Sequence, residues 1–192
     1  MGDMSNMAKP WTHRDYYRLF SLNEEQYGEI LITHIFGGTK MGDAQRGYDV
    51  ETQRAKVRRL LLRSGASRED VKNCLSRAKT GKLRIEVKSK LAWTPTGPAN
   101  VIHCSDTKIK RTRRSKPATH FAVVLFDGKG EGTAEHAWFF STNVARTLRT
   151  KDTKSRYIPV SSLKKPNVRG PIITISGLIN EAARRPLRLR SS

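Results

Sequence analysis

The sequence predicts an α/β fold in which strands and helices alternate along the chain. Residues 83–91 alternate apolar and charged side chains, as a strand with one buried face does. Residues 120–127 form a continuous apolar run, which is typical of a strand buried on both faces. Residues 22–36 carry apolar side chains near helical spacing. At 192 residues the chain suits a single domain, spanning 1–192, that is large enough to bury a core.

Charge is the strongest feature of the composition. Lys and Arg number 37 against 17 acids, which gives a formal net charge of +20. Because so large an excess repels itself in a compact chain, we expect a polyanionic partner, with nucleic acid, and double-stranded DNA first, as the leading candidate. The basic runs lack the apolar opposite face that a membrane-surface helix needs. A basic protein without any nucleic-acid function is the alternative.

The two cysteines and the apolar segments bear on the compartment. Cys74 and Cys104 lie far apart, so neither a disulfide framework nor a four-ligand zinc site is indicated. No apolar run approaches the length of a membrane span, and the first ten residues lack the apolar segment of a secretory signal. The sequence therefore predicts a soluble protein of the cytoplasm.

The N-terminal region predicts a flexible start followed by two helix beginnings. Residues 1–11 are small and polar, with little to pack. Thr12 with Asp15, and Ser21 with Glu24, have the spacing of an N-cap hydroxyl and an acid three residues later.

The second of these helices is expected over 22–36 and is stopped by Gly37 and Gly38. Its N-terminal half carries Glu24, Glu25 and Glu29. Glu29 adjoins the apolar stripe, so it could sit at the edge of the buried face. A solvated helix carboxylate is the alternative for each of the three acids.

Asp49 stands out in the segment after the glycine-rich loop. Tyr48 to Val50 predicts a short strand, which places Asp49 between two bulky residues. Asp is a poor strand former and is costly to desolvate, so a cationic partner is expected there. The Asp49 carboxylate could meet this requirement by coordinating a metal ion, or it could cap the following helix. Because Thr52 is a sufficient N-cap by itself, metal coordination is favoured.

A helical hairpin is predicted over 53–79. Val57, Leu60 and Leu61 are in helical register, and Gly65 is placed to end the first helix. Ser67 with Asp70 has the spacing that begins the second, which carries Cys74 on its apolar stripe. The basic side chains of the first helix are Arg54, Lys56, Arg58, Arg59 and Arg63. They are expected either to contact a phosphate backbone or simply to lie on the solvent-exposed face of the helix.

The strand over 83–91 carries the residues of most chemical interest. Leu83, Ile85 and Val87 share the face that requires a core, while Glu86, Lys88 and Lys90 share the other. A carboxylate two residues from an ammonium on one strand face could be a metal ligand beside a cation. A solvated row of paired charges is the alternative.

Residues 101–118 combine a short strand with the densest basic run. Residues 101–105 are apolar enough for a strand, and no spacing of partners supports a catalytic or metal role for His103 or Cys104. Residues 106–118 predict a flexible basic loop that contacts phosphates. Its candidate nucleic-acid ligands are Lys108, Lys110, Arg111, Arg113 and Arg114.

The C-terminal third predicts three more strands and two helices. The strands are expected at 120–127, 136–141 and 156–160, the last an edge strand because Pro159 cannot donate to a ladder. Thr142 or Asn143 is expected to cap a short helix, and Ser176 is a candidate cap for a helix that ends before Pro186. Residues 184–192 form a basic tail.

This order of elements and the Asp49 … Glu86-x-Lys88 pattern resemble the PD-(D/E)xK superfamily of restriction-endonuclease-like nucleases, over most of residues 21–150. The resemblance implies a mixed central β-sheet flanked by helices, with the 53–79 hairpin as an insertion. By the same resemblance Asp49 and Glu86 match the two acids, Lys88 matches the lysine, and Glu29 matches a further carboxylate ligand on the preceding helix.

The expected chemistry is hydrolysis of a phosphodiester with Mg²⁺, for which Mn²⁺ could substitute, because hard carboxylate oxygens suit these ions. Lys88 would orient or help deprotonate the attacking water and stabilise charge on the phosphate. Lys90, Arg54 and Arg58 are expected to contact the nucleic acid. These features predict a DNA endonuclease such as a restriction enzyme, in which palindromic cutting would imply a homodimer.

Two alternatives remain open from the sequence. A nucleic-acid-binding protein without catalysis would use the same charges only to follow the backbone. A junction-resolving or repair nuclease would keep the fold and change the substrate.

Overall fold

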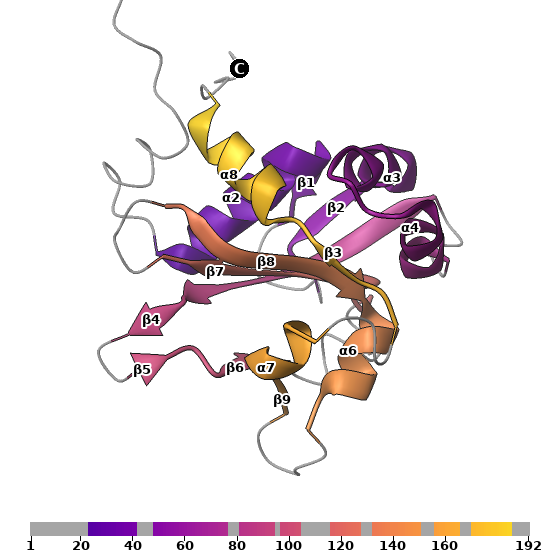
Figure 1. Cartoon of the computed structure of the whole chain (residues 1–192). Helices are drawn as coiled ribbons and strands as arrows, with labels where there is room; N and C mark the ends of the chain where they lie inside the picture. The colour runs from indigo at the N-terminus through magenta and orange to yellow at the C-terminus, as the bar shows by residue number, and fades with distance from the viewer. Residues whose placement is uncertain are drawn as a thin grey trace, which may run out of the picture.

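The protein is an α/β structure built on one mixed six-stranded sheet, as the sequence predicts (Figure 1). The computed structural model describes residues 23–41, 48–76, 81–94, 97–104, 116–127, 132–150, 156–165 and 170–185. The expected flexible segment at 1–11, the cap at Thr12 and the greater part of the basic loop and tail lie outside these ranges.

The sheet has the order β1-β2-β3-β7-β8-β10. Its strands are β1 (Thr39–Lys40), β2 (Val50–Gln53), β3 (Lys82–Leu91), β7 (His120–Phe126), β8 (Ala134–Ser141) and β10 (Ile172–Thr174). Only β3 and β7 run parallel; every other neighbouring pair is antiparallel. Two further pairs of short strands lie apart from this sheet, β4 (Trp93–Thr94) with β5 (Gly97–Pro98) and β6 (Val101–His103) with β9 (Tyr157–Pro159).

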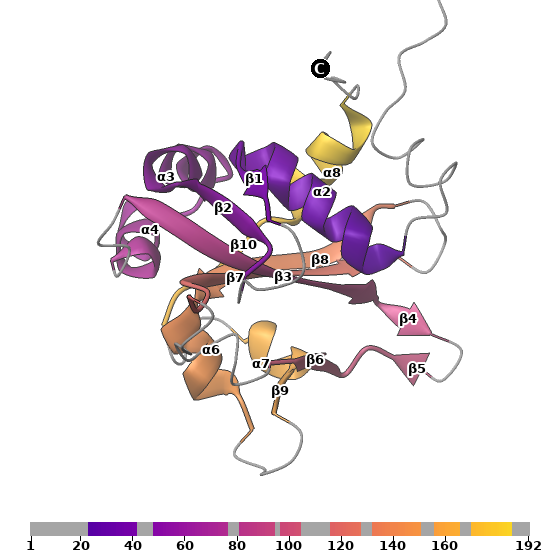
Figure 2. The same ribbon diagram turned by 180° about the vertical axis from the view of Figure 1, so that it is seen from behind.

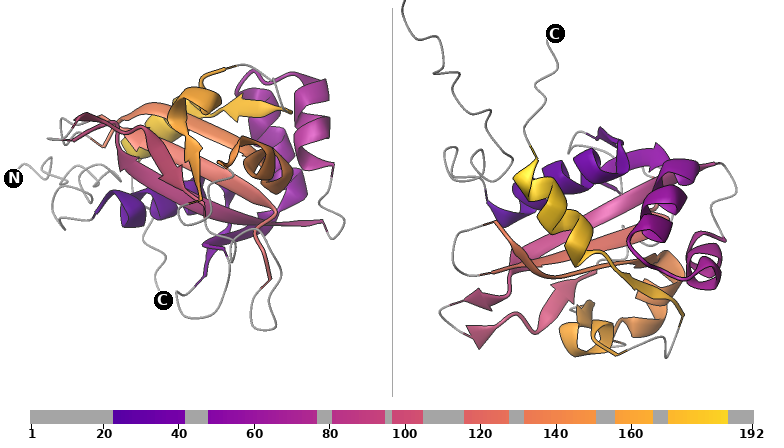
Figure 3. Two further views of the ribbon diagram at one scale, coloured as in Figure 1. Left: turned by 90° about the horizontal axis from the view of Figure 1, so that it is seen from below. Right: turned by 45° about the horizontal axis from the view of Figure 1, so that its top comes forward.

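Helices cover both faces of the sheet (Figures 1 and 2). One face carries α2 (Glu24–Phe36), α3 (Arg54–Arg63), α4 (Arg68–Leu75) and α8 (Ser176–Arg184). The right-hand view of Figure 3 shows α8 and α2 side by side above the sheet. The other face carries α6 (Thr142–Leu148), α7 (Val160–Leu163) and the two small strand pairs.

Each face has its own hydrophobic core. The core beneath α2, α3, α4 and α8 contains Leu83, Ile85 and Val87, which are fully buried as their alternation predicts. The opposite core contains Phe121, Val123 and Leu125 together with residues of α6 and α7. All seven residues of β7 are buried because they point in turn into one core and the other, which confirms the prediction of a strand buried on both faces.

Helix α2 begins two residues later than the sequence suggests. Its N-cap is Asn23, whose side chain accepts from the Gln26 amide, and Ser21 lies outside the described ranges. The helix ends as predicted, because Gly37 adopts the left-handed conformation at φ 56° and its amide reaches back to the last turn. Gly28 brings the helix close to β3: a Cβ there would lie 1.8 Å from Ser89 Oγ.

The expected strand at 48–50 is displaced, because β2 starts at Val50 and Asp49 precedes it. Thr52 is inside β2 and donates to the Phe36 carbonyl, so it does not cap α3. Gln53 takes the N-cap position without a side-chain hydrogen bond. The predicted Ser67 cap of α4 is confirmed, with Ser67 Oγ accepting from the Asp70 amide.

Two further cap predictions are wrong. Ser141, the last residue of β8, caps α6 in place of Thr142 or Asn143. Ser176 is already helical and accepts from the Ala137 amide, which ties α8 to β8. A Ser or Thr hydroxyl can bond either to a neighbouring backbone group or to one distant in the sequence. Sequence spacing predicts only the first kind of bond. Within the described ranges, no helix has the length and apolar character needed to cross a membrane.

Candidate active site at the edge of β3

Glu86 is a carboxylate enclosed in the sheet. It lies on β3 beside Phe121 of β7, on the face opposite Leu83, Ile85 and Val87, and its side chain is 0% exposed. Burying an ionised carboxylate costs several kcal/mol unless cations or donors compensate. At Glu86, therefore, the predicted row of charges on this face is buried and not exposed to solvent.

Asp49 lies directly against this part of β3. Its amide donates to the Ile85 carbonyl over 2.9 Å, and the Val87 amide donates to Asp49 Oδ2 over 2.7 Å. The Asp49 side chain thus takes the place of a backbone partner where the β2 ladder, which pairs with β3 over residues 82–85, comes to an end. The two hydrogen bonds bracket Glu86, so Asp49 lies alongside the segment of β3 that carries Glu86.

Lys88 joins the acids of the site. Its Nζ lies 2.9 Å from Glu86 Oε1 and 3.5 Å from Glu25 Oε1, and the side chain is 21% exposed. Burial works against the charged form, but the carboxylates of Glu86, Asp49 and Glu25 outweigh burial and raise the pKa of the ammonium. Lys88 is therefore a cation with one side still open to solvent.

The α2 acid that contacts the site is Glu25. Glu29, which the resemblance matches to a metal ligand, forms a 2.8 Å ion pair with Lys40 of β1. Because Glu25 lies one turn earlier, it meets Lys88 at the part of β3 beyond the β2 ladder. Sequence spacing alone could not separate the two acids, since positions i and i+4 share one helix face.

A divalent cation needs several oxygen donors close together. In the described part of the chain, no three His, Cys, Asp or Glu side chains gather closely enough to hold a metal ion. Asp49, Glu86 and Glu29 therefore do not form a ready three-ligand site. Proteins commonly hold Mg²⁺ with one or two carboxylates while waters and substrate oxygens complete the shell, so the donor types of Asp49 and Glu86 suit this ion.

The predicted nucleic-acid contacts divide into two groups. Lys90 is exposed, and its Nζ donates to the Val101 carbonyl over 3.3 Å. Arg58 is exposed on α3, whereas Arg54 is half-buried at the start of that helix. The remaining candidates, Lys108, Lys110, Arg111, Arg113 and Arg114, lie outside the described residues.

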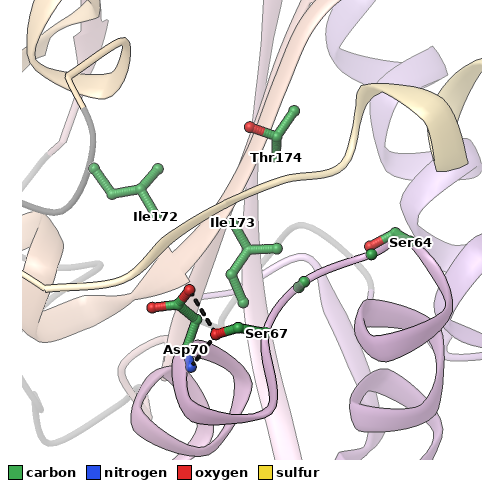
Figure 4. Close-up of a pocket in the computed structure, with 8 residues that line it drawn as sticks. Ser64, Ser67, Asp70, Ile172, Ile173 and Thr174 are labelled. Atoms are coloured by element: carbon green, nitrogen blue, oxygen red, sulfur yellow. Dashed lines mark hydrogen bonds between the residues drawn. The ribbon is translucent and has the colours of Figure 1, made fainter.

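A pocket of 380 Å³ lies elsewhere, between the α3–α4 turn and β10 (Figure 4). Its acid, Asp70, accepts from Ser67 Oγ within the α4 cap. Ile172, Ile173 and Thr174 line the opposite side. Because its one carboxylate is engaged in capping, this pocket has no evident role in the chemistry at Glu86.

The buried histidine belongs to the fold. His120 Nε2 lies 3.0 Å from the Cys74 carbonyl and Nδ1 lies 2.9 Å from Thr119 Oγ1, while the ring stacks on Phe139. Burial lowers the pKa of His120 to about 4. His103, by contrast, is exposed at the end of β6.

A scan of family models finds none that matches this chain, and no curated protein matches it either, so the assignment of a function depends on the geometry of Asp49, Glu86 and Lys88.

Proposed function

We propose that this protein is a Mg²⁺-dependent DNA endonuclease with a restriction-endonuclease-like core, hydrolysing phosphodiester bonds at Asp49, Glu86 and Lys88. The observation that carries the proposal is the fully buried Glu86 carboxylate 2.9 Å from Lys88 Nζ, with Asp49 bonded to the amide of the residue between them. Buried ionisable groups with specific charge partners are concentrated at functional sites.

A second Glu–Lys pair, which joins β2 to β3, shows what an ordinary pair looks like. Glu51 and Lys82 lie 2.8 Å apart, and their side chains are 28% and 54% exposed. Such a pair costs little to form and contributes little. Glu86 has the same type of partner at nearly the same distance and yet is withdrawn from water, which raises the cost of its ionised form and distinguishes this pair from an ordinary surface pair.

The roles follow from the chemistry of each group. Asp49 and Glu86 would hold Mg²⁺, which supplies charge to neutralise the phosphodiester and makes water more acidic. Lys88 can donate from Nζ to a phosphate oxygen or to the attacking water, and its ammonium stabilises the negative charge that develops. The Val87 amide fixes the Asp49 carboxylate at the edge of β3, so no reorganisation of that acid is needed when substrate binds.

The test is cleavage of supercoiled plasmid by the full chain in Mg²⁺ and in EDTA. We expect nicked or linear product only with Mg²⁺, and a loss of about 100-fold or more in Asp49→Asn, Glu86→Gln and Lys88→Met. Binding of DNA should survive in these variants. The matched controls Glu51→Gln and Lys82→Met should cleave as the wild type does. Undiminished cleavage by Glu86→Gln would remove the assignment.

Mg²⁺ binding gives a readout that does not require activity. A ligand that binds only the folded state at ten times its dissociation constant adds about 1.4 kcal/mol to stability. The thermal midpoint of the wild type should therefore rise with Mg²⁺, and that of Asp49→Asn and Glu86→Gln should not. Comparison of branched with linear duplex separates a junction or repair nuclease from a restriction enzyme, and salt-sensitive binding without any product would leave a non-catalytic binder.

A further inference from the structure

The end of β3 carries an exposed lysine, and the strand that follows it carries an exposed aromatic side chain. Trp93, the first residue of β4, is 59% exposed, and Val101 of β6 is 38% exposed; these are the large exposed apolar side chains of the described ranges. Lys90 Nζ bonds to the Val101 carbonyl, so the ammonium is held at one of these two residues. Figure 2 shows β4 and β5 projecting beyond β3, away from α3 and α4.

The backbone around Trp93 is anchored on both sides. The Ala92 amide donates to the Phe126 carbonyl over 2.7 Å, and the Ala99 amide donates to the Ala92 carbonyl over 2.8 Å. Trp93 itself pairs with Pro98 across the small sheet. The indole is therefore presented from a fixed strand, which reduces the entropy lost when a ligand binds it.

We propose that Trp93 stacks on an unstacked base of the nucleic-acid strand that Lys88 and Lys90 hold by its phosphates, an inference that rests on the proposed function. Every base offers a π-face to an indole, and a basic groove with an aromatic side chain is the usual device for binding a single strand. The net charge of +20 complements the phosphates.

The size of the patch argues for a base as the occupant. A tryptophan buries at most about 250 Å², whereas a stable protein interface needs about 800 Å² from each partner. Trp93 and Val101 are too small a surface to hold a second copy of the chain. Trp93 follows Lys88 by five residues, and an extended strand of that length spans at most about 17 Å. This is the length of about five stacked nucleotides, so one nucleic-acid strand is long enough to contact both residues.

The experiment measures binding of a fluorescein-labelled single strand of about 30 nucleotides, and of its duplex, in the Glu86→Gln background so that no cleavage intervenes. Trp93→Ala should bind the single strand about tenfold more weakly with an unchanged dependence on salt, and Trp93→Phe should retain most of the affinity. Lys90→Gln should instead reduce the slope of log K against log salt by about 0.7. Val101→Ala is the matched control and should bind normally.

Wild-type affinity in Trp93→Ala would overturn the proposal, as would a loss confined to the duplex. A wild-type dimer that Trp93→Ala dissociates, with DNA affinity unchanged, would overturn it in favour of self-association. Binding is measured without cleavage, so the two proposals can fail separately. If the wild type cleaves no DNA but Trp93→Ala still weakens binding, the endonuclease is refuted and stacking remains. Normal cleavage with normal affinity in Trp93→Ala would refute only the stacking.

Discussion

At the scale of single residues, Glu86 and His120 are both buried polar groups, but their surroundings differ. The imidazole of His120 is satisfied by Cys74 and Thr119 and stacked on Phe139, so the residue contributes to stability. Glu86 is fully buried beside an ammonium that it shares with Glu25. The first arrangement involves neutral hydrogen-bond partners and a ring stack, whereas in the second the carboxylates of Glu86, Asp49 and Glu25 all act on one ammonium.

His120 makes the stability of the fold depend on pH. Because its pKa is lowered from 6.5 to about 4 by burial, the folded protein holds the ring neutral while the unfolded chain binds a proton below pH 6.5. The contribution is fully present above about pH 6.5 and is lost as the pH falls towards about 4, on the order of 3 kcal/mol in all. Urea unfolding across this range should show the loss in the wild type.

The His120→Gln variant separates this effect from the titration of carboxylates. It should be less stable at neutral pH, because the stack on Phe139 is lost, and it should lack the added pH dependence between about 4 and 6.5. Equal pH dependence in variant and wild type would show that His120 does not carry it.

At the scale of elements, the site exists because α2 and β3 approach closely. Gly28 allows this approach, since a Cβ at that position would lie 1.8 Å from Ser89 Oγ and 2.8 Å from Ser89 Cβ. Glu25 is three residues earlier on the same helix, so the position of its carboxylate against Lys88 depends on the same contact. The α2–β3 distance therefore links packing to the electrostatics of the site.

Gly28→Ala tests the contact between α2 and β3. Alanine favours a helix by about 1 kcal/mol over glycine, but a Cβ–Cβ overlap cannot be relieved by rotation, so we expect a net loss of about 1–2 kcal/mol in the free energy of unfolding. In a Ser89→Gly background the nearest remaining atom is Val87 Cγ1 at 3.6 Å, and the same substitution should cost nothing. Equal losses in both backgrounds would place the strain elsewhere.

At the scale of the whole molecule, the dominant property is the large positive net charge. A charge of +20 on 192 residues draws a polyanion from a distance and makes binding sensitive to salt. Exposed cations such as Arg58 of α3 are available for phosphates, while others are engaged, as Arg185 is with Glu181 on α8.

Salt dependence should report these differences. If about five phosphates are neutralised, DNA affinity should fall about 500-fold between about 50 and 200 mM salt. Arg58→Gln should reduce the slope of log K against log salt by about 0.9, whereas Arg185→Gln should leave it unchanged. An unchanged slope in Arg58→Gln would exclude α3 from the DNA-binding surface.

Periodicity by itself determined the strongest elements: the alternation of Leu83, Ile85 and Val87, the apolar run of β7, and the glycine end of α2 all appear as predicted. These signals are local, because they arise from residues within one element. Caps were less predictable, since Thr52 and Ser176 bond to groups distant in sequence. The strand β10, which pairs with β8, was not predicted, because three residues are too few to show a period.

The features of the candidate site were likewise predictable only in part. Spacing identified Glu86 and Lys88 as neighbours on one strand face, and composition indicated an anionic partner. Only the tertiary structure decided that Glu86 is fully buried, that Asp49 bonds to the Val87 amide, and that Glu25 meets Lys88 while Glu29 pairs with Lys40. The reason is physical: burial and ion pairing depend on which elements pack together, and packing across the chain leaves no trace in the order of residues along a single element.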